Sequence, residues 1–126
     1  MYQYSAQIVR VVDGDTITLD IDLGFHLHNT VDVRLARIDT PETVYYKLEG
    51  IVDEAKNFVE ALVPVGSTCI VDITRPDKYG RYLAEIRFLP GVIDKRLILD
   101  GGRILNDELV RAGLAKRYMG GKKSGS

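Results

Sequence analysis

The chain has 126 residues, which is enough for one hydrophobic core and too few for two. Its 45% hydrophobic and 28% charged residues are typical of an ordinary globular domain, which excludes a disordered chain. Seventeen Lys and Arg against 18 Asp and Glu give a net charge of -1, so any attraction to nucleic acid must be local.

The N-terminal segment "MYQYSAQIVRVV" has the pattern of a strand and lacks the basic start and continuous apolar core of a secretion signal. No apolar run approaches the ~20 residues that span a bilayer. We therefore expect a cytoplasmic protein, or a secreted one if a signal peptide was removed before Met1. Cys69 is the only cysteine, which excludes an intramolecular disulfide and is typical of a small buried side chain.

Three strands are predicted first. Apolar residues alternate in "AQIVRVV" and "TITLDIDL", and "DGD" between them predicts a hairpin with Asp13 and Asp15 at its bend and Gly14 at positive φ. The segment "GFHLHN" is expected to form a loop or turn, with His26 and His28 exposed. Alternation in "TVDVRLARI" then predicts the third strand.

The period changes to 3.6 residues after "DTPET", which predicts an amphipathic helix that ends at Pro64 and Gly66. Two strands, "STCIVDIT" and "YLAEIRFL", follow, and "GVIDKRLILDGGRIL" predicts a further hairpin about Gly101 and Gly102. Asn106 is expected to cap a helix, "DELVRA". The apolar face of the first helix contains Leu48, Ile51, Val52, Ala55, Phe58, Val59 and Leu62.

The order is thus three strands, a helix, two strands and a second helix. A five-stranded antiparallel barrel with a helix between strands three and four is the OB-fold, a mainly β (α+β) architecture. We expect this domain to span residues 1–118 and to be followed by a flexible basic tail, 119–126.

Four carboxylates are expected at strand ends that the hairpin brings close together: Asp13, Asp15, Asp39 and Glu42. Carboxylates crowd together only where something cancels their repulsion, and Ca²⁺, which takes oxygen ligands, does so. Two histidines and one cysteine supply a zinc site poorly.

Two arginines complete the pattern. Arg34 lies in the same predicted strand as Asp39, and Arg81 closes the turn "DKYGR". Guanidinium groups donate paired hydrogen bonds to phosphate oxygens and neutralise charge that builds on a phosphoryl centre. Together with carboxylates that bind a cation, they predict phosphodiester hydrolysis.

Four blocks in this order, "VVDGDTITL", "VRLARIDTPE", "DKYGR" and "LVRAGLAK", resemble the signature blocks of the staphylococcal nuclease family and cover Ile8 to about Lys116. The resemblance implies an OB-fold and a Ca²⁺-dependent nuclease that cleaves DNA and RNA to 3′-phosphate products. It also implies a monomer, and we expect single-stranded or locally melted substrates to be favoured.

Position by position, Asp15 and Asp39 resemble the family's side-chain calcium ligands, and Thr40 resembles the ligand that binds through its backbone carbonyl. Glu42 matches the glutamate that orients the attacking water or takes its proton, and both roles stay open. Asp13 resembles a carboxylate that lies near the metal without binding it.

The substrate contacts are carried over in the same way. Arg34 and Arg81 match the two arginines that hold the scissile phosphate, and Lys78 and Tyr79 match residues that contact the terminal phosphate of a bound nucleotide. Tyr118 is the aromatic residue best placed to stack on a base.

Other readings stay open. Arg37 is not needed by the family pattern, and we expect it to form an ordinary surface ion pair. Tyr45 and Tyr46 either stack on bases or cover part of the core. The whole chain could instead be a non-catalytic OB module that binds single-stranded nucleic acid or a protein partner.

Overall fold

The computed structural model describes residues 2–40, 53–76 and 81–117. Three long strands come first, β1 (Tyr2–Asp13), β2 (Thr16–Gly24) and β3 (Leu27–Leu35), and the short β4 (Ile38–Asp39) follows them. Each of the first three strands pairs antiparallel with its neighbour in sequence. The predicted meander is therefore confirmed.

The second half alternates strands and helices. Helix α2 (Glu54–Leu62) is followed by β5 (Thr68–Pro76) and β6 (Tyr82–Phe88). After these come α3 (Lys95–Gly101), β7 (Arg103–Ile104), α4 (Leu105–Arg111) and β8 (Lys116–Arg117). None of the helices within the described ranges is long and apolar enough to cross a membrane.

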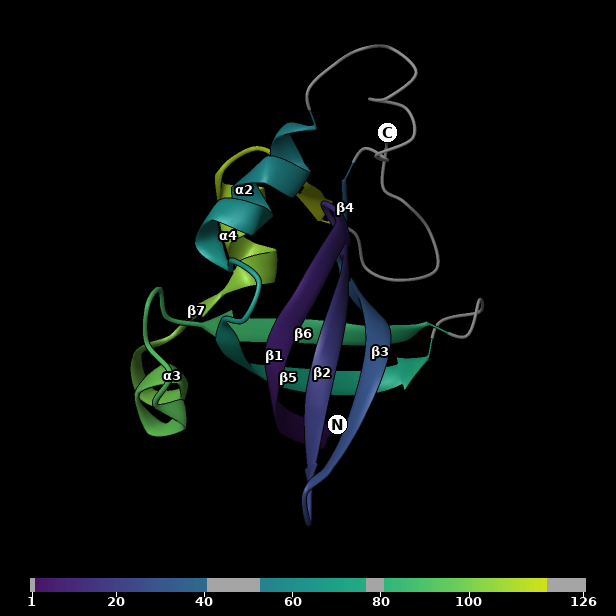
Figure 1. Ribbon diagram of the computed structural model, residues 1–126. Coiled ribbons are helices and arrows are strands. Elements are labelled where there is room, and N and C mark those ends of the chain that lie inside the picture. The colour runs from purple at the N-terminus through teal and green to yellow at the C-terminus, as the bar shows by residue number, and fades with distance from the viewer. Residues whose placement is uncertain (1, 41–52, 77–80, 118–126) are drawn as a thin grey trace.

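The main sheet closes on itself. Its strand order is β3-β2-β1-β5-β6-β7, and β3 also pairs in parallel with β6, which closes β3, β2, β1, β5 and β6 into a five-stranded barrel and leaves β7 outside the ring (Figure 1). This is the OB arrangement predicted from the order of elements. Inward side chains of the strands and of two helices form one core: Ala6, Ile8, Val11, Ile17, Leu19, Ile21, Val33, Leu35, Ile38, Ala55, Val59, Val63, Cys69, Val71, Ile73, Ala84, Ile86, Phe88, Leu105 and Leu109.

Helices α2 and α4 lie together over one end of the barrel, and the N-terminus of β1 lies at the other end (Figure 1). Helix α2 begins after Asp53, whose side chain accepts a hydrogen bond from the Lys56 N–H. Ala55 and Val59 of the predicted apolar face are buried, and Pro64 and Gly66 follow the helix end as expected. The earlier members of that face, in residues 48–52, lie outside the described residues.

The predicted hairpin about Gly101 and Gly102 is wrong. Residues 95–101 form α3, and Asp94 caps it by accepting a hydrogen bond from the Arg96 N–H. Only β7 of this segment is a strand, and it pairs with β6. Gly102 is needed because a Cβ there would collide with the Ile98 carbonyl oxygen, so the glycine pair marks a helix end packed against a strand rather than a turn.

The predicted capping role of Asn106 is also wrong. Helix α4 has no side-chain cap, and Asn106 is 2% exposed inside the protein. Its Nδ2 donates hydrogen bonds to the carbonyl oxygens of Ala36 (3.1 Å) and Ala84 (3.0 Å), and its Oδ1 accepts one from the Ile86 N–H (3.3 Å). The side chain therefore ties α4 to the place where β3 and β6 meet. Gly113, with φ +77°, follows the helix end.

The segment before the third strand, predicted to be a loop or turn, contains a tight turn at the tip of a hairpin. Gly24 pairs with Leu27, and Phe25 and His26 form the turn with φ of 54° and 61°. These angles are typical of the turns that connect two twisted antiparallel strands, where Asn and Gly are the usual residues. Phenylalanine rarely adopts such angles, so the residue types do not indicate that the turn is only two residues long.

Candidate active site

The turn between β1 and β2 carries two of the predicted carboxylates. The Asp13 side chain accepts a hydrogen bond from the Asp15 backbone N–H (3.1 Å), which fixes the turn. Gly14 does not have the positive φ predicted for it. It is needed for another reason, because a Cβ there would lie 2.6 Å from the Ala55 Cβ and 2.9 Å from the Thr40 Oγ1. Helix α2 and the chain after β4 therefore pack directly on this turn.

Arg34 is brought to the same place by the pairing of β2 with β3, in which it lies opposite Thr16. It is 6% exposed, and its Nη1 donates a hydrogen bond to the Leu35 carbonyl oxygen (3.0 Å). Its Nη2 lies 3.5 Å from the Asp15 Oδ2 and 3.2 Å from the Asp39 Oδ1. One guanidinium group thus lies between two of the predicted metal ligands.

Thr40 closes the group on the other side of Asp15. Its backbone N–H donates a hydrogen bond to the Asp15 Oδ2 (3.4 Å), and the residue is 5% exposed. Its Oγ1 is buried and has no hydrogen-bond partner within the described part of the chain. Strand β8 pairs with β4 and puts Lys116 opposite Asp39.

The electrostatics of this group centre on Asp15. Burial, together with the hydrogen bond and the negative charge of Asp13, raises the pKa of Asp15 from 3.8 to about 6. The Arg34 guanidinium and the Thr40 N–H lower the pKa of Asp15, but they offset only part of the rise. Arg34 and the Thr40 N–H therefore compensate only part of the cost of ionising Asp15.

The donors here suit a hard cation. Asp15, Asp39 and Thr40 supply oxygen atoms, which Ca²⁺ prefers, and the Asp15 carboxylate is costly to ionise. Among the described residues, the buried Thr40 Oγ1 has no hydrogen-bond partner. No three His, Cys, Asp or Glu side chains are grouped closely enough to hold a metal ion within residues 2–40, 53–76 and 81–117. The described residues thus fit part of a calcium site, and Glu42 lies outside them.

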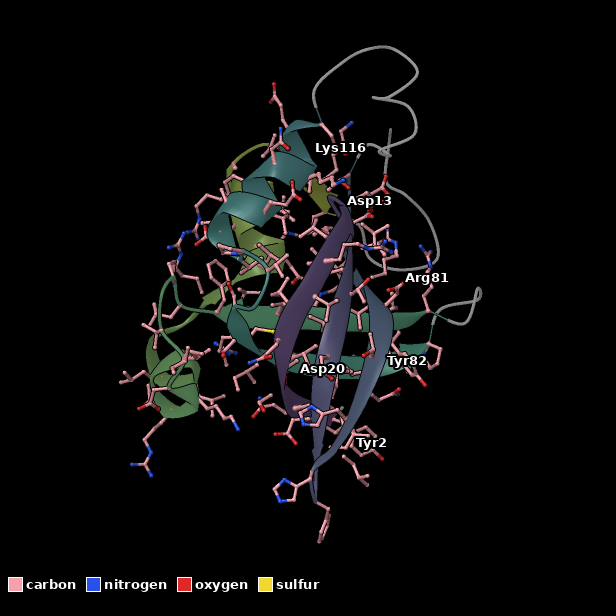
Figure 2. All side chains as sticks on the ribbon, viewed as in Figure 1. Tyr2, Asp13, Asp20, Arg81, Tyr82 and Lys116 are labelled. Atoms are coloured by element: carbon pink, nitrogen blue, oxygen red, sulfur yellow. The ribbon has the colours of Figure 1, made fainter. Side chains whose placement is uncertain are left out.

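Arg81 lies next to the group along the barrel wall. It directly precedes β6, whose first residue, Tyr82, pairs with Val33, the neighbour of Arg34. Figure 2 shows Asp13 and Arg81 on the same side of the molecule, above Tyr82 and far from Tyr2. The closure of the barrel therefore puts the strand that contains Arg34 next to the strand that Arg81 precedes, although the two arginines are distant in the sequence.

The remaining predicted site residues cannot be placed. Glu42, Lys78, Tyr79 and Tyr118 lie outside the described residues, as do Tyr45 and Tyr46. The described part of the chain brings together Asp13, Asp15, Arg34, Asp39 and Thr40.

Arg37 forms the ion pair that we predicted for it, with Glu85 of β6. Its side chain is 51% exposed and its φ is 62°, so it points away from the carboxylates at a turn between β3 and β4. The backbone geometry at this turn thus separates Arg37 from the group that contains Arg34 and the carboxylates.

Thr16 is a member of the group that the sequence interpretation missed. Its hydroxyl donates a hydrogen bond to the Asp15 Oδ1 (3.3 Å). Regular counting outward from the turn at Phe25 and His26 would pair Thr16 with Leu35, and only the bulge between Asp22 and Gly24 shifts the register so that Thr16 lies opposite Arg34. The position of the hairpin tip alone would therefore not have placed Thr16 beside the arginine.

Residues 32–125 match the sequence model of a family described as Staphylococcal nuclease homologue. This range contains the predicted residues from Arg34 to Tyr118 and leaves out the first hairpin turn.

Three relatives illustrate the similarity. An uncharacterized protein of Methanocaldococcus jannaschii is 30% identical, over 92% of this chain and 60% of that protein. Endonuclease YhcR of Bacillus subtilis is 30% identical, over 92% of this chain and 9% of its own length. Thermonuclease of Staphylococcus hyicus is 28% identical, over 87% of this chain and 57% of its own length. The chain thus spans less than two thirds of each of these relatives.

Proposed function

The chain belongs to the staphylococcal nuclease family, and on that premise we propose that it is a nuclease that hydrolyses phosphodiester bonds of DNA and RNA. We further propose that the reaction depends on Ca²⁺ and leaves 3′-phosphate products. The relatives named as endonuclease and thermonuclease support the general activity. The observation that carries the proposal is the Arg34 guanidinium held between Asp15 and Asp39.

This arrangement favours catalysis over simple binding of nucleic acid. A buried arginine between two carboxylates contributes little positive potential to a polyanion, because its charge is offset locally. If a cation binds the two carboxylates, the Arg34 guanidinium group is released from them and can donate hydrogen bonds to phosphate oxygens.

In the proposed reaction Arg34 and Arg81 bind the non-bridging oxygens of the scissile phosphate. They stabilise the negative charge that builds there and assist departure of the 5′-oxygen. Glu42 orients the attacking water or accepts its proton. Asp15, Asp39 and the Thr40 carbonyl would hold Ca²⁺, which supplies positive charge that polarises the phosphate when it is bound.

The other predicted residues have supporting roles. Asp13 holds the Asp15 backbone in place through the hydrogen bond in the turn. Lys78 and Tyr79 contact a terminal phosphate of the nucleic acid, and Tyr118 stacks on a base.

Digestion of plasmid DNA and of RNA, with either Ca²⁺ or EDTA present, tests the proposal. We expect cleavage with Ca²⁺, none with EDTA, and 3′-phosphate ends by end-group analysis. Binding of single strands without cleavage under any metal condition would instead favour a non-catalytic OB module. Cleavage that persists in EDTA would contradict the calcium requirement alone.

A further inference from the structure

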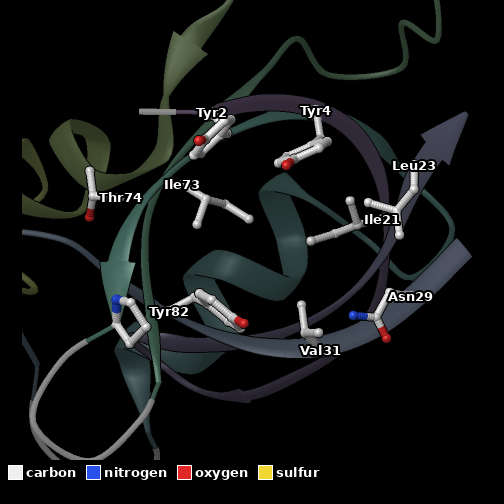
Figure 3. Close-up of a pocket in the computed structure, with 10 residues that line it drawn as sticks. Tyr2, Tyr4, Ile21, Leu23, Asn29, Val31, Ile73, Thr74 and Tyr82 are labelled. Atoms are coloured by element: carbon white, nitrogen blue, oxygen red, sulfur yellow. The ribbon is translucent and has the colours of Figure 1, made fainter.

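The open end of the barrel contains a cavity of about 660 Å³, at the end opposite to helices α2 and α4. Its floor includes Ile21 and Ile73, which are 4% and 8% exposed. Tyr2 and Tyr4 of β1 and Tyr82 of β6 stand around its mouth (Figure 3). This cavity is not part of the carboxylate and arginine group described above.

We propose that this cavity binds an unpaired nucleobase of the strand that the chain cleaves. The inference rests on the proposed nuclease function and names a second contact surface for the same substrate. It assigns the substrate class as single-stranded or locally melted nucleic acid.

The aromatic residues supply the first argument. The rings of Tyr4 and Tyr82 come from opposite walls of the cavity and project inward, with Tyr2 beside them (Figure 3). Tyr82 is 42% exposed and Tyr2 is 71% exposed, so ring surface is accessible to a ligand. Stacking of a base on an aromatic side chain contributes ~1–3 kcal/mol and tolerates any base, because every base has a π-face.

The polarity of the lining supplies the second argument. None of the described residues that line the cavity carries a charge, while Asn29, Thr74 and the tyrosine hydroxyls can each form hydrogen bonds. A neutral heterocycle with donors and acceptors along its edge matches such a lining. Phosphate does not, because its charge would be left without a partner inside an apolar cavity.

The position of the cavity supplies the third argument. Tyr82 directly follows Arg81, and adjacent Cα atoms are ~3.8 Å apart. Tyr82 also pairs with Val33, the neighbour of Arg34. Strands β3 and β6 thus border the cavity and also lead to the two arginines, so a strand whose phosphate is held by Arg34 and Arg81 could run along this wall and place another of its bases at the cavity. A base in a duplex is stacked and paired and cannot enter.

The experiment measures binding without cleavage. Fluorescence anisotropy gives the Kd of an end-labelled ten-thymidine oligonucleotide in EDTA, and a series of such oligonucleotides carries one abasic site at each position in turn. For the wild-type chain we expect one position at which the abasic site raises Kd by about 5- to 100-fold, which is the range expected for loss of one stacked base.

Variants then assign this effect to the cavity. In Tyr82→Ala we expect the position-dependent rise in Kd to fall to within about twofold, and Tyr82→Phe, which keeps the ring, should retain most of it. Tyr4→Ala provides a second variant from the opposite wall in case the first folds poorly. Leu99→Ala is the matched control, because Leu99 is 43% exposed and lies on α3, away from the cavity.

The outcomes separate the two proposals. Equal Kd values along the abasic series for the wild type, no measurable binding, or full retention of the effect in both alanine variants would each overturn the inference. A position-dependent effect that depends on Tyr82, in a chain that cleaves nothing in the digestion assay, would support the base site and refute the nuclease proposal.

Discussion

Arg34 and Asp15 form the most constrained pair of charged residues in the described part of the site. Arg34 neutralises two carboxylates at once, but the pKa of Asp15 is still raised to about 6. Burial and the charge of Asp13 outweigh the arginine. The metal-free site therefore carries more negative charge than its surroundings stabilise, and this is the condition in which a bound cation has the largest effect.

The raised pKa of Asp15 predicts a pH dependence of stability. Because the pKa is higher in the folded than in the unfolded state, the contribution of Asp15 is fully present below pH 3.8 and is lost as the pH rises through about 6. In EDTA, the free energy of unfolding of the wild type should therefore fall relative to Asp15→Asn between pH 4 and 7, by on the order of 2–3 kcal/mol. Urea unfolding of both proteins across this range measures the difference.

Calcium gives the control for that measurement. Because the cation favours the ionised form of Asp15, added Ca²⁺ should stabilise the wild type more at pH 8 than at pH 5. A stability difference between wild type and variant that does not change with pH would contradict the assigned environment of Asp15.

Replacement of Arg34 predicts a loss of activity. Arg34→Ala should lower kcat by at least ~10²–10³-fold, because removal of one electrostatic partner of a transition state has this effect elsewhere. Steady-state cleavage of a defined oligonucleotide measures kcat, and circular dichroism checks that the variant is folded. Arg37→Ala is the matched control, since Arg37 pairs with Glu85 at the surface and should keep near wild-type activity. Near-normal turnover in Arg34→Ala would refute its role.

At the level of elements, apolar residues that recur with periods of two and 3.6 residues predicted the meander, helix α2 and strands β5 and β6, because each of these elements buries one face. Helix α4 was also predicted, but one element and one helix cap were predicted wrongly where a local signal has two structural uses. Paired glycines end α3 instead of forming a turn, and Asn106 packs inside the protein instead of capping α4. Both outcomes depend on what the neighbouring strands place beside the residue, and a local pattern does not contain that information.

In the candidate site, too, some features could be predicted from the sequence and others depend on tertiary packing. The positions of Asp13, Asp15, Arg34 and Asp39 at strand ends were sufficient to predict that they meet. The close packing that requires Gly14, and the contact of Thr16 with Asp15, depend on the three-dimensional approach of α2 and on the register of β2 and β3.

The buried position of Asn106 predicts a large loss of stability in Asn106→Ala. Three hydrogen bonds would be lost, to Ala84 and Ile86 of β6 and to Ala36 in the turn after β3, so we expect a destabilisation of about 2–5 kcal/mol in urea unfolding. Asp107→Ala is the control from the same helix, because its pair with Arg117 is exposed and should contribute at most about 1 kcal/mol. Equal losses in the two variants would contradict the structural role of Asn106.

For the whole molecule, the decisive feature is the closure of the barrel. The family pattern lies on strands from both halves of the chain, and the parallel pairing of β3 with β6 brings Arg34 and Arg81 to one wall. The base cavity at the open end and the carboxylate group both border this wall. A substrate bound across the cavity and the carboxylate group would therefore contact both β3 and β6, the two strands whose pairing closes the barrel.

This closure is also the shortest pairing in the barrel wall. It joins three residue pairs, whereas β2 and β3 are joined by eight, and beyond it the Ala36 N–H donates to the Ala84 carbonyl oxygen (2.8 Å). Local opening should begin there, so we expect the Ala36 amide to exchange with deuterium faster than the Ile8 amide, which bonds to Ser67 between β1 and β5. A bound, uncleaved oligonucleotide should slow exchange at Ala36, and exchange that is unchanged by it would contradict the expectation. The bound substrate would then stabilise the pairing of β3 with β6, which opens transiently in the free protein.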